Sequence, residues 1–269
     1  MDEEHYIVFD IGGTNMRVAA ATKEALGEIK KVPTPKDFEE GVTTFLTLAK
    51  EEAKGVMIVG AAGCVAADTI DENGVMGGAR NLPKWQGFNI VHAFSDGLGV
   101  QVKIVNDTAL VGLGELFVGA GKGATALVYV TVSTGVGAAY IVGGVVKGAG
   151  GTSWVKIAGV DLESQISGTA VKKKFGIEPK DLESLEERNK LADTLAEGLE
   201  KILEKWPADT IVLGGSMIVG VNPVPIEQVR ASLGALLKER YVPNILMATL
   251  GDNGGLEGAR MLASHAANK

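Results

Sequence analysis

The chain alternates short apolar runs with glycine-rich turns, and between them lie longer segments with apolar residues every three or four positions. The first apolar run begins at Tyr6 and ends at Asp10. Two glycines and a threonine follow, and a second run begins at Met16. An apolar run, a glycine turn and another apolar run are typical of a β-hairpin. Residues 29–33 continue the pattern, which predicts a three-stranded meander.

The rest of the first half alternates predicted helices and strands. Phe38, Val42 and Phe45 recur at helical spacing within 36–54, and Gly55 follows as a C-cap glycine. A continuous apolar run is typical of a buried parallel strand. The further elements expected here are such a strand at 56–62, a loop-rich segment at 63–85 with a tight turn at 71–74, helices at 88–98 and 108–118, and a strand at 102–105. This order predicts a mixed sheet with helices on its faces.

The second half repeats the opening pattern. An apolar run at 124–132 leads through the turn 133–137 into runs at 138–142 and 145–147. We interpret the shared design as an internal duplication, with two domains that each begin with a hairpin. Downstream, the spacing of apolar residues predicts helices at 162–175 with a break at Ser167-Gly168, at 181–205, at 226–239 and at 256–267, and strands at 210–213 and 244–249.

The composition indicates a globular protein, with 46% hydrophobic and 22% charged residues. A net charge of −7 argues against nucleic-acid binding, and no run reaches the roughly 18 apolar residues of a membrane helix. Cys64 is the one cysteine, so no intramolecular disulfide is expected, and a start without a signal peptide predicts a cytoplasmic location. Three scattered histidines make a Cys/His zinc site unexpected.

Two stretches carry candidate chemistry. Glycines after Asp10 leave backbone N–H groups for an anion, and Asp10 is suited to a hydrated metal ion beside phosphates; the alternative is an ordinary hairpin turn. Asn106-Asp107 stands just past a predicted parallel strand, at the edge where ligands bind; the alternative is a helix N-cap. The two similar turns, 10–14 and 133–137, would together hold both ends of one triphosphate in a cleft.

Six stretches, in order along nearly the whole chain, resemble the ROK family of sugar kinases within the sugar kinase, Hsp70 and actin superfamily. They are the first phosphate motif at 10–17, the Asn-Leu-Pro-x-Trp loop at 81–85, the Asn-Asp pair at 106–107, the second phosphate motif at 131–137, the adenosine motif at 212–216 and the closing loop and helix at 250–259. The resemblance implies an α/β fold of two ribonuclease-H-like domains, each a mixed five-stranded sheet with flanking helices, with a cleft between them. We expect these domains at 1–112 (sugar and phosphate) and 113–269 (nucleotide), and leave open whether the last helix, 254–267, packs back on the first.

The resemblance also implies an activity, the ATP-dependent phosphorylation of a hexose hydroxyl, by default the 6-hydroxyl of glucose. Asp107 would be the general base, and Asp10 would hold Mg²⁺ through water. The implied substrate-binding residues are Asn106, Asn81, Gly63 and Glu163. The implied ATP-binding residues are Asp10, Gly12, Gly13, Thr14, Thr134, Gly135, Gly214, Gly215 and Gly254. ATP and Mg²⁺ are the expected cofactors.

The chain departs from the family at its zinc loop. Most members carry a cysteine-rich loop before the Glu-x-x-x-Ser-Gly stretch, which stands here at 163–168; the cysteines are absent and the loop is shorter, so that no zinc is expected. The family's Glu and His sugar contacts fall near Gly151 and Trp154, and neither is kept. Trp154 either stacks on a sugar face or fills the space left by the zinc loop.

Several alternatives remain at this point. Fructose, mannose and N-acetylhexosamines are other acceptors, and a non-catalytic sensor of sugar and ATP keeps the same motifs. Regulators of the family carry an N-terminal helix-turn-helix, for which the residues before the first strand leave no room. An actin-like filament protein fits less well because the chain is short. A homodimer that binds sugar and ATP, without nucleic acid or membrane, is expected.

Overall fold

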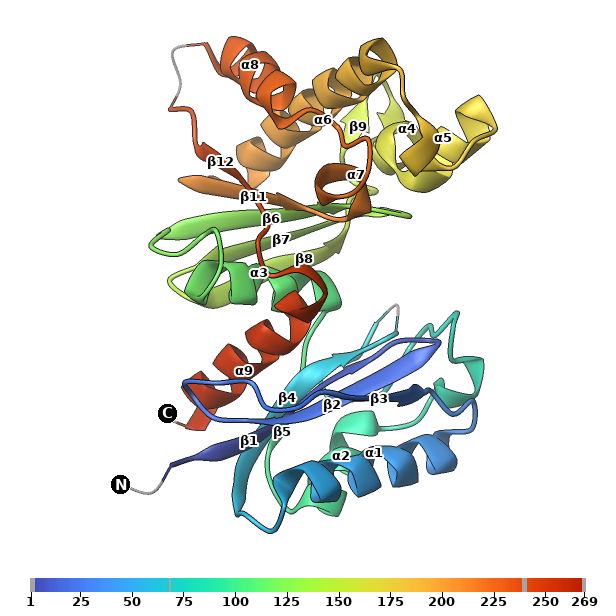
Figure 1. Ribbon diagram of the computed structural model, residues 1–269, viewed down its shortest axis with the longest axis vertical. Coiled ribbons are helices and arrows are strands. Elements are labelled where there is room, and N and C mark those ends of the chain that lie inside the picture. The colour runs from blue at the N-terminus through green and yellow to red at the C-terminus, as the bar shows by residue number, and fades with distance from the viewer. Residues whose placement is uncertain (1–2, 68, 239–240, 268–269) are drawn as a thin grey trace. The chain divides into compact units, whose positions relative to one another are not determined.

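The chain forms two compact units, each with its own sheet (Figure 1). The computed structural model describes residues 3–67, 69–238 and 241–267. Unit 1 comprises Met1–Gly114 and Asp252–Lys269, and unit 2 comprises Glu115–Gly251. The chain thus leaves unit 1 two residues after the expected boundary, and its last helix belongs to unit 1. Both sheets have five strands and are mixed, which confirms the predicted fold class.

The sheet of unit 1 has the strand order β3–β2–β1–β4–β5. Its strands are β1 (His5–Ile11), β2 (Asn15–Ala21), β3 (Lys30–Pro33), β4 (Ile58–Val65) and β5 (Val102–Ile104). The first three are antiparallel, as the meander predicts, and β4 and β5 are added in parallel. β4 ends at Val65 rather than at residue 62, because its last residues continue to pair with β1.

Both faces of this sheet are covered, because alternate residues of β1 point to opposite sides. Ile7 and Phe9 pack with α1 (Phe38–Ala53) and α2 (Ile90–Leu98). Tyr6 and Val8 pack on the other side with α9 (Gly254–Ala267) and the first half of α3 (Asp107–Phe117). The last helix therefore packs back on the first sheet, the point that the sequence left open (Figure 1).

The sheet of unit 2 has the order β12–β11–β6–β7–β8. Its strands are β6 (Ala126–Val132), β7 (Val136–Val142), β8 (Val145–Gly151), β11 (Thr210–Gly214) and β12 (Asn244–Met247). Strands β6 to β8 form a second antiparallel meander, and β11 and β12 are parallel to β6. Unit 2 therefore repeats the strand pattern of unit 1, as the duplication predicts.

Helices cover the sheet of unit 2 as well, and the predicted break in the first of them is confirmed. They are α4 (Glu163–Ile166), α5 (Gly168–Phe175), α6 (Leu185–Lys205), α7 (Ser216–Val219) and α8 (Ile226–Leu237), with the short 3₁₀ turn η2 (Pro179–Asp181). A further 3₁₀ turn, η3 (Gly251–Asn253), lies where the chain returns to unit 1. Helix α6 begins four residues later than predicted, because Ser184 caps it by accepting from the N–H of Glu187. The end of the helix predicted at 226–239 lies outside the described residues.

One hairpin was not predicted. The segment after β8 forms β9 (Lys156–Ile157) and β10 (Val160–Asp161), joined by Ala158 and Gly159 with φ of 50° and 81°. Two consecutive residues with positive φ are the geometry of a tight primed turn, for which Ala-Gly is a weak sequence signal. Gln165 donates from Nε2 to the carbonyls of Ile157 and Val160, and thereby ties the hairpin to α4.

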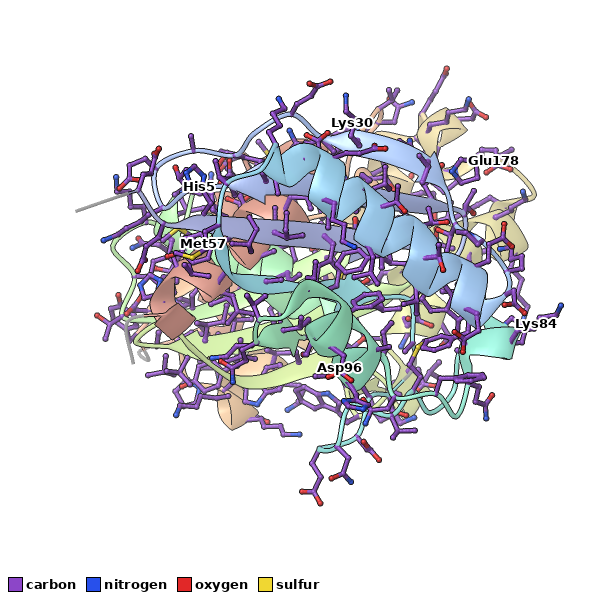
Figure 2. All side chains as sticks on the ribbon, turned by 90° about the horizontal axis from the view of Figure 1, so that it is seen from below. His5, Lys30, Met57, Lys84, Asp96 and Glu178 are labelled. Carbon is purple, nitrogen blue, oxygen red and sulfur yellow. The ribbon has the colours of Figure 1, made fainter. Side chains whose placement is uncertain are left out.

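The loop of unit 1 between β4 and α2 is well anchored. The predicted turn at 71–74 is present, with the N–H of Gly74 donating to the carbonyl of Asp71 at 3.0 Å. Trp85, in the 3₁₀ turn η1 (Pro83–Trp85), is fully buried and donates from Nε1 to the carbonyl of Pro35. Its neighbour Lys84 is exposed, as is Asp96 on α2 (Figure 2). Among the described helices, none combines the length and apolarity that crossing a bilayer requires.

Candidate functional site

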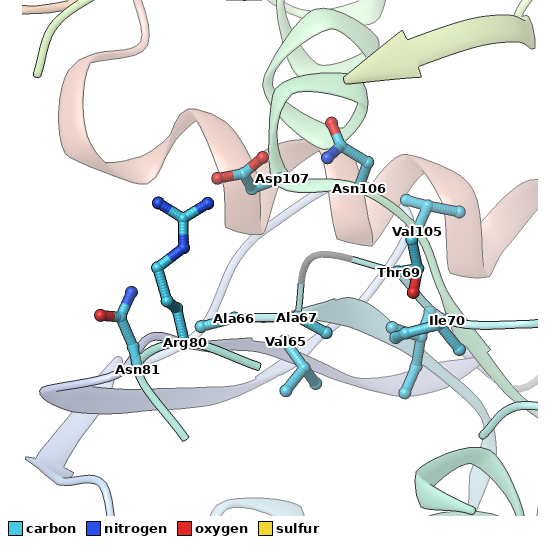
Figure 3. Close-up of a pocket in the computed structure, with 11 residues that line it drawn as sticks. Val65, Ala66, Ala67, Thr69, Ile70, Arg80, Asn81, Val105, Asn106 and Asp107 are labelled. Carbon is cyan, nitrogen blue, oxygen red and sulfur yellow. The ribbon is translucent and has the colours of Figure 1, made fainter. Parts of the chain in front are cut away.

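A pocket in unit 1 gathers the two sequence-predicted asparagines and Asp107 (Figure 3). It has a volume of about 510 Å³. Its walls come from the end of β4, the loop before η1 and the end of β5, and its lining residues are Val65, Ala66, Ala67, Thr69, Ile70, Arg80, Asn81, Ile104, Val105, Asn106 and Asp107. We call it the Asp107 pocket. Gly63 is not in its lining.

The Asn106-Asp107 pair lies where β5 leads into α3. The side-chain Oδ1 of Asn106 accepts from the N–H groups of Thr108 and Ala109, at 3.0 and 3.3 Å. Asn106 therefore caps the helix, which is the alternative role that the sequence offered for Asp107. Asp107 stands in the first turn of α3, where the helix dipole favours a negative charge.

Only one oxygen of Asp107 is engaged locally. Its Oδ1 accepts from the N–H of Thr108 at 2.6 Å and from the hydroxyl of Thr108 at 3.3 Å. Within the described residues, Oδ2 has no hydrogen-bond partner. The carboxylate points into the pocket, on the side from which the Arg80 side chain extends (Figure 3). This geometry suits a group that accepts a proton from a bound molecule.

Asn81 joins this pocket to the first glycine turn. A Cβ atom placed on Gly13 would lie 2.3 Å from the Cβ of Asn81. Glycine at this position therefore lets the Asn81 side chain lie directly against the turn. The buried residues Leu82 and Trp85 hold the loop that carries Asn81. The Asp107 pocket and the turn thus share a wall.

The carbonyl groups of this turn accept hydrogen bonds from Thr34 and Lys36, which lie between β3 and α1. The carbonyl of Gly12 accepts from the hydroxyl of Thr34 at 2.7 Å, that of Gly13 accepts from Nζ of Lys36, and that of Thr14 accepts from the N–H of Thr34 at 2.9 Å. The N–H groups of Gly13 and Thr14 have no acceptor among the described residues. Backbone N–H groups left in this way form an anion-binding concavity.

A second pocket of unit 1, of about 400 Å³, opens on this turn. Its lining residues are Asp10, Gly12, Gly13, Thr14, Asn15, Arg17, Lys31 and Asp252. Arg17 donates to Oδ2 of Asp10 through Nε at 3.1 Å and through Nη2, and through Nη1 to the carbonyl of Asp252 at 2.7 Å. Asp10 is thus held in an ion pair at the edge of the first glycine turn.

Cys64 contacts the other oxygen of Asp10. Its Sγ lies 3.3 Å from Oδ1 of Asp10, and the side chain is buried. Burial, and then the negative charge of Asp10, raise the pKa of the Cys64 thiol well above its usual value. The thiol is therefore a hydrogen-bond donor to Asp10 and not a nucleophile.

In unit 2 the second glycine turn is built in the same way. The carbonyl of Ser133 accepts from the N–H of Gly168 at 2.7 Å, and that of Thr134 accepts from the hydroxyl of Thr169 at 2.8 Å. Glu163 accepts from the N–H of Val136 at 2.8 Å. The sequence-predicted residues Thr134, Gly135 and Glu163 are therefore brought together at this turn. Glu163 supports its backbone.

A pocket of about 550 Å³ lies beside this second turn. Its lining residues are Ser133, Thr134, Gly168, Thr169, Lys172, Glu178, Pro179, Lys180, Ser216, Gly220 and Val221. Gly214 and Gly215 directly precede Ser216 in the sequence but do not line this pocket. A Cβ on Gly215 would lie 2.3 Å from the carbonyl oxygen of Val132. A Cβ on Gly214 would lie 2.4 Å from the hydroxyl oxygen of Tyr129, so close packing explains both glycines.

The remaining predicted positions are not among the lining residues of these three pockets. Gly254 begins α9 in unit 1, whereas Gly214 and Gly215 belong to unit 2. A Cβ on Gly63 would lie 2.2 Å from the carbonyl oxygen of Phe9, so that its glycine is explained by strand packing. Three residues beside these sites, Arg80, Thr34 and Lys36, were not predicted from the sequence. Arg80 alone had a signal, because it is adjacent to Asn81.

Trp154 packs inside unit 2. Its ring lies edge-on to that of Trp206, with centroids 5.2 Å apart, and Nζ of Lys205 lies 4.2 Å from its centroid. These contacts favour the space-filling role for Trp154 over stacking on a sugar. Among the described residues, no three His, Cys, Asp or Glu side chains are grouped so as to hold a metal ion.

Comparisons with known proteins agree with one another. The family model described as the ROK family matches residues 6–154. A fructokinase of Zymomonas mobilis is 26% identical over 305 aligned positions, which cover 100% of this chain and 99% of the fructokinase. The ROK hexokinase structure from Thermus thermophilus has a TM-score of 0.86 at 23% identity, with 98% of this chain and 99% of the hexokinase covered.

A second solved structure has ligands. It is a ROK family glucokinase from Streptomyces griseus in complex with glucose and AMPPNP. The TM-score is 0.74 at 21% identity, and the match covers 97% of this chain and 99% of the glucokinase. The likeness to the two structures shows that this chain has their fold.

Proposed function

The chain belongs to the ROK family, and from that premise we propose that it is a sugar kinase that transfers the γ-phosphoryl group of ATP to a hexose hydroxyl. The full-length match to a fructokinase supports this activity. The observation that carries the proposal is the Asp107 pocket, in which a carboxylate with one uncommitted oxygen shares its walls with two asparagine side chains. The Asn81 side of this pocket adjoins the first glycine turn, the proposed anion-binding site.

Asp107 is proposed as the general base. A sugar hydroxyl is a weak nucleophile at neutral pH, and Oδ2 of Asp107 would accept its proton as the bond to phosphorus forms. Such base catalysis contributes about 10²- to 10⁴-fold in rate. The amide groups of Asn106 and Asn81 would orient the sugar by donating to its oxygens. Positioning of acceptor and donor would supply much of the remaining rate enhancement.

The glycine turns are proposed to bind the phosphates of ATP. The N–H groups of Gly13 and Thr14 in unit 1, and Thr134 and Gly135 in unit 2, are the donors of the two turns. Gly214, Gly215 and Gly254 are proposed to lie near the adenosine. The AMPPNP complex of the Streptomyces griseus glucokinase supports ATP as the donor.

The residues near the first turn fit Mg²⁺ only as an ion held mainly by phosphates and water. Arg17 and Cys64 already contact the two oxygens of Asp10, so that Asp10 would reach the ion through a water molecule. Mg²⁺ commonly keeps several waters and takes one or two carboxylates. When bound, it neutralises charge on the phosphates. Asp10, held in place by Arg17, would accept hydrogen bonds from the water shell of the ion.

Glucose is the default acceptor, and the ROK hexokinase and glucokinase folds support a hexose. Fructose, mannose and N-acetylhexosamines are the alternatives. Gly63 and Glu163 are weaker candidates for sugar contacts, because packing on Phe9 and support of Val136 already explain them. The homodimer, the cytoplasmic location and the absence of zinc stay predictions.

The test is a coupled assay of ADP release with glucose, fructose, mannose, N-acetylglucosamine and N-acetylmannosamine. We expect at least one sugar to raise the rate well above ATP alone, and Asp107→Asn to lower kcat by about 10²-fold or more. The matched control is Asp96→Asn, which removes one exposed carboxylate of unit 1 outside the pocket. It should keep the full rate.

Two outcomes would contradict the proposal in different ways. If no sugar stimulates ADP release, but calorimetry shows that sugar and ATP bind, then the chain is a sensor and not a kinase. If Asp107→Asn retains the wild-type rate with an active sugar, then the kinase activity stands and the assignment of the base is wrong.

A further inference from the structure

Two successive backbone N–H groups of the first glycine turn are left for a ligand. The preceding N–H, that of Gly12, donates within the turn to the carbonyl of Asn15 at 2.9 Å. The N–H groups of Gly13 and Thr14 have no acceptor among the residues that the structure describes, whereas the carbonyl groups of Gly12 and Gly13 both accept a hydrogen bond. Each unused N–H therefore shares a peptide unit with a carbonyl that is already bound.

Both carbonyl groups are bound by side chains from the connection between β3 and α1. The hydroxyl of Thr34 donates to the carbonyl of Gly12 at 2.7 Å, and Nζ of Lys36 donates to the carbonyl of Gly13. A trans peptide unit is planar, with its C=O and N–H pointing in opposite directions, and the described part of the chain has no cis peptide bond. The two unused N–H groups therefore point away from the side chains that bind the carbonyls.

The pocket of about 400 Å³ beside the turn agrees with this direction, because its lining includes Gly13 and Thr14 but neither Thr34 nor Lys36. Its ionisable lining residues are Asp10, Arg17, Lys31 and Asp252. These two carboxylates and two cations balance in charge, and the side chains of Thr14 and Asn15 both donate and accept. The backbone N–H groups therefore supply the excess of donors, and the charge of Lys36 on their far side adds to their attraction for an anion.

The segment that carries the two supporting side chains is itself fixed. Thr34 is 5% exposed, and Pro35 follows it, which restricts the backbone of Thr34 to extended conformations. Nε1 of the buried Trp85 donates to the carbonyl of Pro35 at 3.3 Å. Asp37 then caps the N-terminus of α1. The turn is thus supported by a segment that packing and capping hold in place.

We propose that Thr34 and Lys36 are positioning residues for the phosphate donor. By holding two carbonyl groups of the turn, they aim the N–H groups of Gly13 and Thr14 at a phosphate group of ATP. The inference rests on the proposed kinase function, in which this turn binds phosphate. Both side chains act through the backbone and not by contact with the phosphate. Lys36 also acts through its charge, because a hydrogen bond from an ammonium group polarises the peptide unit and strengthens the N–H on its other side.

The experiment measures the binding of inorganic tripolyphosphate, a phosphate chain without base or ribose, to the whole protein by calorimetry with MgCl₂ present. Thr34→Val keeps the shape of the buried side chain but removes its hydroxyl, and we expect it to weaken binding about three- to tenfold. Thr34→Ser keeps the hydroxyl and should bind within about twofold of the wild type. Lys36→Met should weaken binding about tenfold, because it removes a charged donor.

Lys50→Met is the charge-matched control for Lys36→Met. Lys50 is an exposed lysine in the last turn of α1, at the opposite end of that helix from Lys36. Its removal changes the net charge by the same amount and should leave the affinity for tripolyphosphate unchanged.

Two further readouts separate positioning from a merely structural role. With a sugar that turns over, Thr34→Val and Lys36→Met should raise the KM for ATP and leave the KM for the sugar within about twofold, because neither residue lines the Asp107 pocket. The defect of Lys36→Met should shrink between about 0.05 M and about 0.5 M KCl, since Lys36 is exposed and salt screens its charge. The defect of Thr34→Val should persist.

Binding also separates this inference from the kinase proposal. Weaker binding of tripolyphosphate by Thr34→Val and Lys36→Met, with affinity restored in Thr34→Ser, supports the inference even if no sugar is phosphorylated. Wild-type affinity in both variants overturns it, even if ATP and a sugar react. Equal losses in Thr34→Val and Thr34→Ser also overturn it, because the packing of the side chain and not its hydroxyl would then support the turn.

Discussion

The guanidinium of Arg17 donates to Oδ2 of Asp10 from two of its nitrogens, and from the third to the carbonyl of Asp252. Strand β2 is thereby joined both to β1 and to the segment that begins α9. Residues of one motif, separated by seven positions, thus support each other across the antiparallel pair in which they face one another. The ion pair with Arg17 explains how the negatively charged Asp10 is held at the edge of a turn that otherwise offers N–H groups.

From this contact we predict that Arg17→Met lowers kcat about tenfold or more and raises the Mg²⁺ concentration needed for half-maximal rate, because Asp10 loses the group that orients it. Arg17→Lys keeps the charge but not the three-way geometry, and we expect an intermediate defect. Titration of MgCl₂ at saturating ATP and sugar measures both effects. A variant with the wild-type Mg²⁺ dependence would show that Asp10 does not act through the ion.

A second prediction concerns Gly13 and Asn81. In Gly13→Ala the new methyl group meets the Cβ of Asn81 at 2.3 Å, and neither atom is the end of a flexible chain. We expect a loss of about 1–3 kcal/mol in the free energy of unfolding, and a rise in KM for ATP. Gly234→Ala is the matched control, because its Cβ meets nothing within 4 Å in helix α8; it should stabilise the protein by about 0.5–1 kcal/mol.

The same pair offers a rescue. Asn81→Gly removes the Cβ that causes the clash, so the double variant should regain most of the stability that Gly13→Ala loses. Denaturant unfolding of the four proteins completes a double-mutant cycle. Strictly additive losses would mean that the turn and the loop do not touch.

Sequence patterns predicted the parts of the fold that depend on local chemistry. Both meanders follow from apolar runs broken by glycine turns, and the break at Ser167-Gly168 follows from an N-cap residue before a new helix. The hairpin at Ala158-Gly159 was missed, because its turn lacks the Asn-Gly or Asp-Gly signal. The predicted end of β4 and the predicted start of α6 were also wrong. Pairing with β1 decides where β4 ends, and the Ser184 cap decides where α6 begins.

The candidate site was predictable only where its residues belong to motifs. Asp107 and Asn81 were located by sequence, and the structure brings them into one pocket. The contacts of Thr34 and Lys36 with Gly12 and Gly13 span more than twenty residues, and no local pattern signals them. Tertiary packing alone decides such partners, so the support of the turn became visible only in the structure.

A third prediction uses the chemistry of Cys64. Because its pKa is raised, first by burial and then by the carboxylate of Asp10, the thiol stays protonated through neutral and mildly alkaline pH. We expect iodoacetamide at pH 8 to leave the native protein unlabelled for hours and to modify it stoichiometrically in guanidinium chloride. Mass spectrometry reads the result without ambiguity, since Cys64 is the one cysteine. Fast labelling of the native protein would contradict both the burial and the raised pKa.

The last prediction concerns Glu115, which is fully buried where the chain enters unit 2. Its carboxylate accepts from the N–H groups of Ala120, Thr249 and Leu250, at 2.8, 2.8 and 2.9 Å. Glu115→Ala leaves these donors without a partner, so we expect the free energy of unfolding to fall by about 3 kcal/mol or more. Glu115→Gln should cost less, because its carbonyl oxygen still accepts from two of the three. The exposed Glu197→Gln on α6 is the control and should change stability by less than about 0.5 kcal/mol. Urea unfolding followed by circular dichroism measures all three variants, and equal stability of Glu115→Ala and the wild type would show that water satisfies these donors.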